Sequence, residues 1–232
     1  MITVRKSADR GHVSFGWLNA KHSFSFGSYH DPRHMGHSAL RVINQDIVKA
    51  GTGFPPHGHD NMEILTLVLR GAITHRDSMG NEARLPAGEF QLMSAGTGVT
   101  HSEYNRDADT LELLQIWLYP DVQNAEPRYQ QKRFPEEKGL QLVVSPDGEK
   151  DSLLIRQQAR IYHGRFDAAQ EAVHTLVGKR AWIQVIKGEV VANDSILQDG
   201  DGAALDLSKK AGETLVSLRA NRDSEFLFFD LP

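Results

Sequence analysis

Apolar residues in this chain gather in short runs that have the length and composition of β-strands. These runs span residues 40–44, 63–69, 113–118, 140–145, 153–162, 182–191, 213–218 and 225–231. Glycine-bearing breaks typical of hairpin turns, such as Arg70-Gly71 and Lys187-Gly188, separate many of them. Many short strands joined by tight turns predict an all-β fold, either a sandwich or a barrel. The best helical candidate is the short polar segment Asp167–Ala172.

The chain also contains a faint internal repeat. The stretch EILTLVLRGAITH, followed by LPAGEFQLMSAG, has the same order of strand, glycine, strand and turn as AWIQVIKGEVVAN followed by LQDGDGAALDL. Between the two copies lies the charged, proline-containing stretch Pro127–Gly139, which we interpret as a linker or a surface excursion. We therefore expect two β-barrels, formed by residues 1–128 and residues 129–232.

Composition narrows the class of protein. With 40% hydrophobic and 24% charged residues, the 232-residue chain is not expected to be disordered. It has no apolar run near the ~20 residues of a membrane helix and no signal-peptide pattern, so we expect a cytoplasmic protein without a membrane partner. A net charge of −4 offers no general attraction to nucleic acid, which favours a small-molecule ligand. Because the chain has no cysteine, any metal must be bound by nitrogen and oxygen.

The strongest chemical signal is the pair His57-Gly-His59, which follows a stretch rich in glycine and proline. Side chains two apart in an extended strand share a face, so both imidazoles can point into a barrel. One such pair is weak, because 11 histidines in 232 positions give roughly 0.5 pairs of this spacing by chance. A second same-face pair, His101-Ser-Glu103, strengthens the signal.

Together the two pairs can bring three imidazoles and one carboxylate to a single metal ion. This donor set suits Fe(II), Mn(II), Ni(II), Cu(II) or Zn(II), and an octahedral ion would keep two positions open for substrate and dioxygen. The alternative is that the histidines are solvated loop residues and that Glu103 faces water. We consider the metal site the better interpretation, because two same-face pairs occur together.

The spacing of these residues resembles that of the cupins. Gly51, His57, His59, Glu63 and Gly71 follow the first cupin motif, with one additional residue before the last glycine. The second motif begins normally at residues 80–88, but Gln91 stands where a histidine is expected and His101 comes ten positions later. Including this displaced histidine, the sequence resembles the pirin family of bicupins over residues 24–48, 57–71 and 86–105. Among pirins it is most similar to the bacterial pirin-like quercetin 2,3-dioxygenases. The resemblance is most specific in the first half of the chain and continues, more loosely, to Pro232.

The resemblance implies two cupin barrels, each a double-stranded β-helix or jelly roll, of which only the first binds metal. Carried over position by position, it makes His57, His59, His101 and Glu103 the metal ligands. The generic cupin pattern nominates Glu63 instead of Glu103; we rank Glu103 first and keep Glu63 as a neighbour that could orient an imidazole. In the second half, His163 and His174 have no partner at metal-binding spacing, and we expect them on the surface or hydrogen-bonded in the core.

Residues near the N-terminus are expected to have structural roles. The spacing of His22, His30, His34 and His37 matches neither a strand pair nor a helical metal site, so we expect them at a pocket rim or on the surface. We expect the aromatic residues Phe24, Phe26 and Tyr29 to pack in a barrel wall.

The activity that the resemblance implies is a metal-dependent quercetin (flavonol) 2,3-dioxygenase. Such an enzyme would open the heterocycle of its substrate with O2 and release CO, with Glu103 as general base. It would use one divalent metal ion; we expect Fe(II) first, with Zn, Ni, Co, Mn or Cu as alternatives. Two other functions stay open. One is a metal-bearing regulatory pirin that binds a transcription factor or metabolic enzyme, without direct contact to nucleic acid; the other is a cupin isomerase or epimerase.

Overall fold

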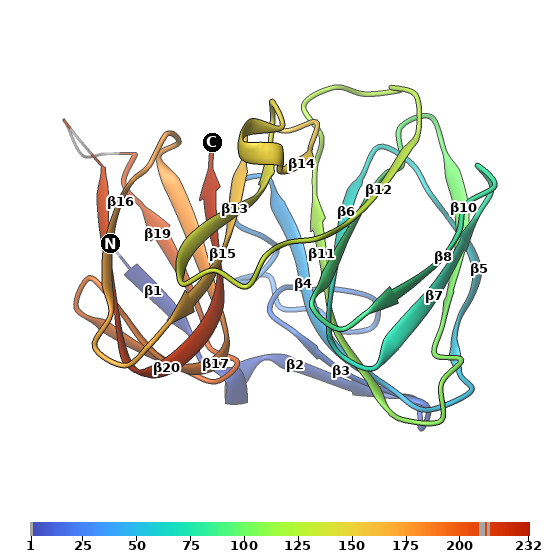
Figure 1. The fold of residues 1–232 in the computed structure, drawn as a ribbon, viewed down its shortest axis with the longest axis horizontal. Coiled ribbons are helices and arrows are strands. Elements are labelled where there is room, and N and C mark those ends of the chain that lie inside the picture. Colours follow the sequence, from blue (N-terminus) through green and yellow to red (C-terminus); the bar gives the residue numbers. More distant parts are fainter. Residues whose placement is uncertain (1, 209–211, 213) are drawn as a thin grey trace.

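Two β-barrels lie side by side in the computed structural model, which describes residues 2–208, 212 and 214–232 (Figure 1). The first barrel consists of β2 (Gly11–Ser14), β3 (Leu18–His22), β4 (Leu40–Val48), β5 (Gly53–His59), β6 (Glu63–Arg70), β7 (Ala72–Asp77), β8 (Glu82–Pro86), β9 (Glu89–Ser94), β10 (Val99–Tyr104), β11 (Leu111–Leu118) and β12 (Arg128–Arg133). Its strands form a seven-stranded sheet in the order β12-β9-β6-β11-β4-β3-β2 and a four-stranded sheet in the order β5-β10-β7-β8. The predicted all-β fold is therefore confirmed.

The second barrel is one highly curved nine-stranded sheet. Its strands are β1 (Ile2–Arg5), β13 (Gly139–Ser145), β14 (Leu153–Leu154), β15 (Arg160–Phe166), β16 (Glu171–Thr175), β17 (Arg180–Ala192), β18 (Ser195–Gln198), β19 (Gly202–Asp206) and β20 (Leu215–Leu231). The long strands β17 and β20 pair along most of their length and join its two sides. Because β20 is continuous, the two predicted runs 213–218 and 225–231 are one strand, and Glu213 lies outside the described residues.

Each barrel contains one strand from the other predicted half of the chain. Strand β1 pairs with β19, which places the N-terminal strand in the second barrel (Figure 1). In the other direction, β12 pairs with β9, so residues 128–133 of the predicted linker form a strand of the first barrel. The division into residues 1–128 and 129–232 stays a proposal, and β1 and β12 are the two strands that lie across it.

A single hydrophobic core crosses the boundary between the barrels. It contains Leu65 and Phe90 from the first barrel and Trp182 and Phe229 from the second, all at most 2% exposed. Two further cores fill the interiors of the individual barrels. Burying apolar side chains from both halves in one cluster removes them from water together, so each barrel stabilises the other.

Two local predictions are wrong. Asp167–Ala172 is not a helix: residues 167–170 form the turn between β15 and β16, in which Ala169 has a φ of 66°, and Glu171 and Ala172 begin β16. The chain does not break at Gly188; β17 continues through it as a bulge, with φ at 102° and shifts in its register with β20. The only helices among the described residues are the one-turn 3-10 segments Ser7–Asp9 and Glu149–Asp151. Neither has the length or apolar character needed to cross a bilayer.

Truncating a residue of the shared core should destabilise the whole chain. Phe229 is fully buried, so Phe229→Ala should lower the free energy of unfolding by about 3–5 kcal/mol and preserve one cooperative transition. Chemical denaturation followed by fluorescence and circular dichroism measures both quantities. Val173→Ala, at a side chain 67% exposed, is the control and should change stability by no more than about 0.5 kcal/mol. Two separated transitions in wild type would show that the barrels do not share a core.

Candidate metal centre

Strand β10 lies between β5 and β7 and brings the predicted site residues together. In the antiparallel register, His101 lies opposite His57 on β5 and opposite Asp77 on β7. The two strands approach closely where β5 begins, because a Cβ at Gly53 would lie 2.2 Å from the carbonyl oxygen of Glu103. A glycine at this position therefore permits the pairing that aligns the histidines.

The three predicted imidazoles form a compact triangle. Ring centroids of His57, His59 and His101 lie 4.4–4.9 Å apart, and the Nε2 atoms of His59 and His101 are separated by 3.0 Å. Two neighbouring ligands of one ion, each about 2.1 Å from it, lie roughly 3.0–3.4 Å apart. His57 donates its Nδ1 hydrogen to the Pro55 carbonyl at 2.8 Å, which leaves its Nε2 lone pair available. The arrangement fits a divalent metal ion.

Burial keeps two of these rings neutral. Desolvation and the neighbouring imidazoles lower the pKa of His59 to about 4 and that of His101 to about 3. A metal binds the neutral imidazole, so near neutral pH these two imidazoles would not have to lose a proton first.

Glu103 lies beside this triangle in a fully enclosed environment. Its carboxylate accepts hydrogen bonds from the side-chain amides of Gln91 at 3.4 Å and Gln115 at 3.2 Å. Its potential ligand atom groups with those of His101 and His75, all within 4.8 Å of one another. Burial raises the pKa of Glu103. The structure thus brings the four predicted residues together around His101, and their assignment as metal ligands stays a prediction.

A fourth histidine lies at this site and was not predicted from the sequence. His75 on β7 is fully buried, lies 2.9 Å through Nε2 from Asp77 and stacks on Tyr129 with ring centroids 4.8 Å apart. Its Nδ1 has no hydrogen-bond partner among the described residues. The signal was present in the sequence, because His75-x-Asp77 has the same spacing of two as the other pairs.

A cavity of about 280 Å³ opens onto the histidines. Its aromatic walls are Phe26, Phe54 and Trp117, and Trp117 packs edge-on against both Phe26 and His59. A second, mainly apolar cavity of about 220 Å³ shares Phe26 and Phe54 with the first and also contains Trp17. Phe26 therefore lines both cavities, and Phe24 is buried against Trp182 as expected of a wall residue.

One buried acid lies where the two cavities meet. Asp46 on β4 is 5% exposed, and its Oδ1 has no hydrogen-bond partner among the described residues. Burial, together with the neighbouring Glu103, raises the pKa of Asp46 to about 7. This carboxyl group is therefore largely protonated below neutral pH.

Glu63 forms no hydrogen bond with an imidazole of the described residues. It is 1% exposed on β6, and its carboxylate accepts hydrogen bonds from the Ser94 hydroxyl at 2.8 Å and from the backbone N–H of Arg156 at 3.3 Å. It therefore joins the first barrel to the segment that leads into β15.

The remaining predicted histidines lie outside the two groups of potential metal ligands found in the described residues. His30 is exposed, His34 and His37 border a different cavity, and His22 is buried beside the apolar one, 2.6 Å from Asn44. In the second barrel, His163 lies 2.7 Å from Glu225 and His174 lies 3.3 Å from Asp230. Both have hydrogen-bond partners, as expected.

Known proteins are similar to this chain over its full length. The family model Pirin matches residues 3–118, and the Quercetinase C-terminal cupin domain matches residues 142–231. The chain is 48% identical over 234 residues to a Quercetin 2,3-dioxygenase of Escherichia coli strain K12, covering 100% of this chain and 99% of the relative. It also superimposes on the nickel(II) complex of the bacterial pirin YhhW from Escherichia coli, with a TM-score of 0.95, 47% identity and coverage of 100% and 99%.

Removing one imidazole should abolish stable metal binding. His101→Ala deletes the central ring of the triangle and should weaken nickel(II) binding by more than about 100-fold, beyond the loss typical of residues that only support a ligand. Isothermal titration and metal analysis after dialysis measure this. His30→Ala, which alters an exposed histidine outside the site, should bind like wild type. Unchanged nickel stoichiometry in His101→Ala would contradict the assignment.

Asp46 should make stability depend on pH. Between about pH 4 and 7 the folded state holds a proton on Asp46 that the unfolded state loses, so stability falls as pH rises through this window. Asp46→Asn has no such loss, and its stability relative to wild type should increase by roughly 2–4 kcal/mol from pH 5 to pH 8. Urea denaturation of both proteins, stripped of metal by a chelator, tests this. An equal difference at the two pH values would refute it.

Proposed function

The chain belongs to the pirin family, and on that basis we propose that it is a metal-dependent flavonol 2,3-dioxygenase. In this reaction O2 opens the heterocycle of a quercetin-type substrate and CO is released. The observation that carries the proposal is the triangle of three imidazoles, two of which, His57 and His59, line an aromatic cavity. The relatives support it, since one is named Quercetin 2,3-dioxygenase and another structure is a bacterial pirin with nickel(II).

We assign His57, His59, His101 and Glu103 as the residues that hold the ion, with Fe(II) as the first choice of metal. When bound there, a divalent ion would supply Lewis-acid activation and a template on which substrate and dioxygen meet. The donor set of nitrogen and oxygen suits such ions.

The walls of the cavity would bind and orient the flavonol. Phe26, Phe54 and Trp117 offer aromatic surfaces to a planar ring system and exclude water from the histidines. The cavities of about 280 and 220 Å³ share Phe26 and Phe54, so an elongated substrate of several rings can extend from one to the other. Asp46 borders both cavities and offers a polar group to a phenolic hydroxyl.

Glu103 would accept the proton of the substrate 3-hydroxyl. Its carboxylate borders the cavity and is fixed by the amides of Gln91 and Gln115, which donate to different oxygens. A base held in place beside the substrate contributes typically about 10²–10⁴-fold to a rate. His75 interacts electrostatically with Glu103, and its ring is held by a hydrogen bond to Asp77. His75 would therefore position the carboxylate of Glu103.

Replacing the base should lower kcat strongly and change the stability of the fold little. Glu103→Gln keeps the shape of the side chain and should lower kcat for quercetin by about 10²–10⁴-fold, measured as loss of substrate absorbance with metal-loaded protein. His57→Ala should lower activity to background, and His30→Ala should match wild type. Quercetin consumption that persists in His57→Ala would show that the reaction does not occur at this site.

A further inference from the structure

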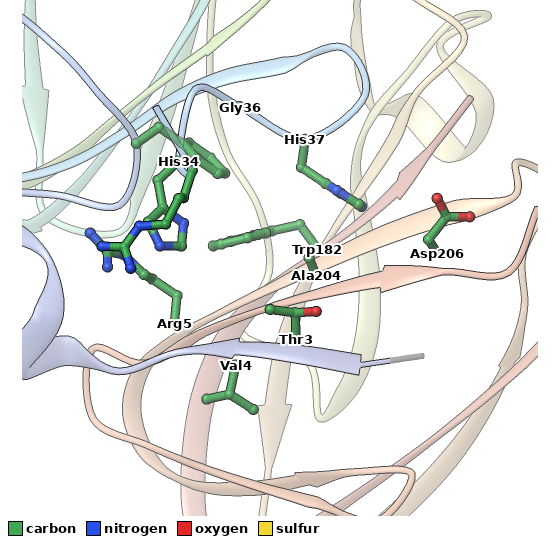
Figure 2. A pocket seen from close by; sticks show the side chains of 11 residues that line it. Thr3, Val4, Arg5, His34, Gly36, His37, Trp182, Ala204 and Asp206 are labelled. Carbon is green, nitrogen blue, oxygen red and sulfur yellow. The ribbon is translucent and has the colours of Figure 1, made fainter. Parts of the chain in front are cut away.

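A separate cavity of about 290 Å³ lies where the two barrels meet, away from the histidine triangle. Its walls come from β1, β17 and β19 of the second barrel and from the segment that joins β3 to β4 in the first. Figure 2 shows Arg5 and His34 at one end of this inter-barrel cavity, Asp206 at the other and Trp182 between them. Nothing in the proposed dioxygenase reaction uses this site.

Arg5 is a buried cation that pairs with no carboxylate of the described residues. The residue is 6% exposed, donates one hydrogen bond to the Tyr29 hydroxyl at 2.7 Å, and leaves its Nε without a partner among the described residues. No carboxylate of the described chain lies within 4.0 Å of it. Burying a charge without a counter-charge is costly, so this guanidinium is suited to receive an anion.

The other charges of the cavity are already paired. Arg33 binds Asp31 through two hydrogen bonds of 3.0 Å, and Asp206 lies 3.5 Å from Arg180. His34 is held neutral, because burial and the nearby Arg5 lower its pKa. Arg5 is thus the charge in this cavity that an incoming ligand would neutralise.

An apolar surface lies beside the guanidinium. Trp182 is 2% exposed, packs against Phe24 with ring centroids 4.7 Å apart, and has an indole N–H without a partner among the described residues. Guanidinium groups bind carboxylates in a planar, two-bond geometry, and aromatic rings stack or pack edge-on against indole.

We propose that the inter-barrel cavity binds a small aromatic carboxylate, whose carboxylate pairs with Arg5 and whose ring packs against Trp182. The volume of about 290 Å³ is at the lower limit of ligand pockets, which suits a compound of one ring. The site goes beyond the proposed dioxygenase function and does not depend on it.

Benzoate is the probe, titrated into nickel-loaded protein by calorimetry and by indole fluorescence. We expect one benzoate per inter-barrel cavity, with benzamide at least about tenfold weaker, because a charge-assisted hydrogen bond is lost. Arg5→Gln, which removes the charge, should weaken benzoate binding by at least about tenfold. Ala204→Leu, which fills the cavity from β19 and leaves every charge in place, should do the same.

Two matched variants separate this site from others. Arg219→Gln removes an exposed positive charge from β20, and His57→Ala disables the proposed metal site; both should keep the benzoate affinity within about twofold. Thermal unfolding checks that each variant folds, and Ala204→Leu decides the question if Arg5→Gln does not. Three results would overturn the proposal: no benzoate binding at millimolar concentration, binding unchanged in Ala204→Leu, or binding lost in His57→Ala alone. Inorganic phosphate binding in preference to benzoate would overturn the assignment to an aromatic ligand.

Discussion

The pairing of β10 with β5 on one side and β7 on the other is the constraint on which the site depends. It brings the imidazoles of His57 and His59 on β5 against that of His101 on β10, which is 1% exposed. His59 and His101 resist protonation, because burial and the neighbouring imidazoles disfavour a positive charge on either ring. The same packing that stabilises the sheet therefore prepares a set of neutral nitrogen donors, and the bulge between His101 and Glu103 adjusts the carboxylate beside them.

The sequence predicted those parts of the site that depend on strand periodicity. The i, i+2 pairs at His57 and His101 are local patterns, and the structure shows their side chains converging. Residues that reach the site through long-range pairing were harder to find. Gln115 comes from β11 of the other sheet, and Asp46 becomes notable only because folding buries it without a partner. His75 was not predicted, although its spacing from Asp77 equals the spacing of His101 from Glu103.

The fold was predictable at the level of strands and repeats, and less so where pairing overrides local signals. Gly188 lies at the position that corresponds to Gly71 in the first repeat, where the chain turns from one sheet into the other. In the second barrel the extended pairing of β17 with β20 carries the strand through that corner as a bulge. Likewise, the polar composition of β12 indicated a linker, but its backbone pairs with the edge of β9 and its half-buried side chains need little hydrophobicity.

The second barrel also supports the first directly. Glu63 occupies the position of a metal ligand in the general cupin pattern, yet here it receives a hydrogen bond from Arg156 and joins the barrels. The segment between β3 and β4 connects them a second time, because Phe24 packs on Trp182 of the second barrel and Phe26 packs on Trp117 beside the histidines. These two phenylalanines are two residues apart in a segment held by the hydrogen bond from Ser25 N–H to the His34 carbonyl. The inter-barrel cavity and the histidine-lined cavity therefore share one short piece of chain as a wall, and a displacement of that segment at one cavity must alter the packing at the other.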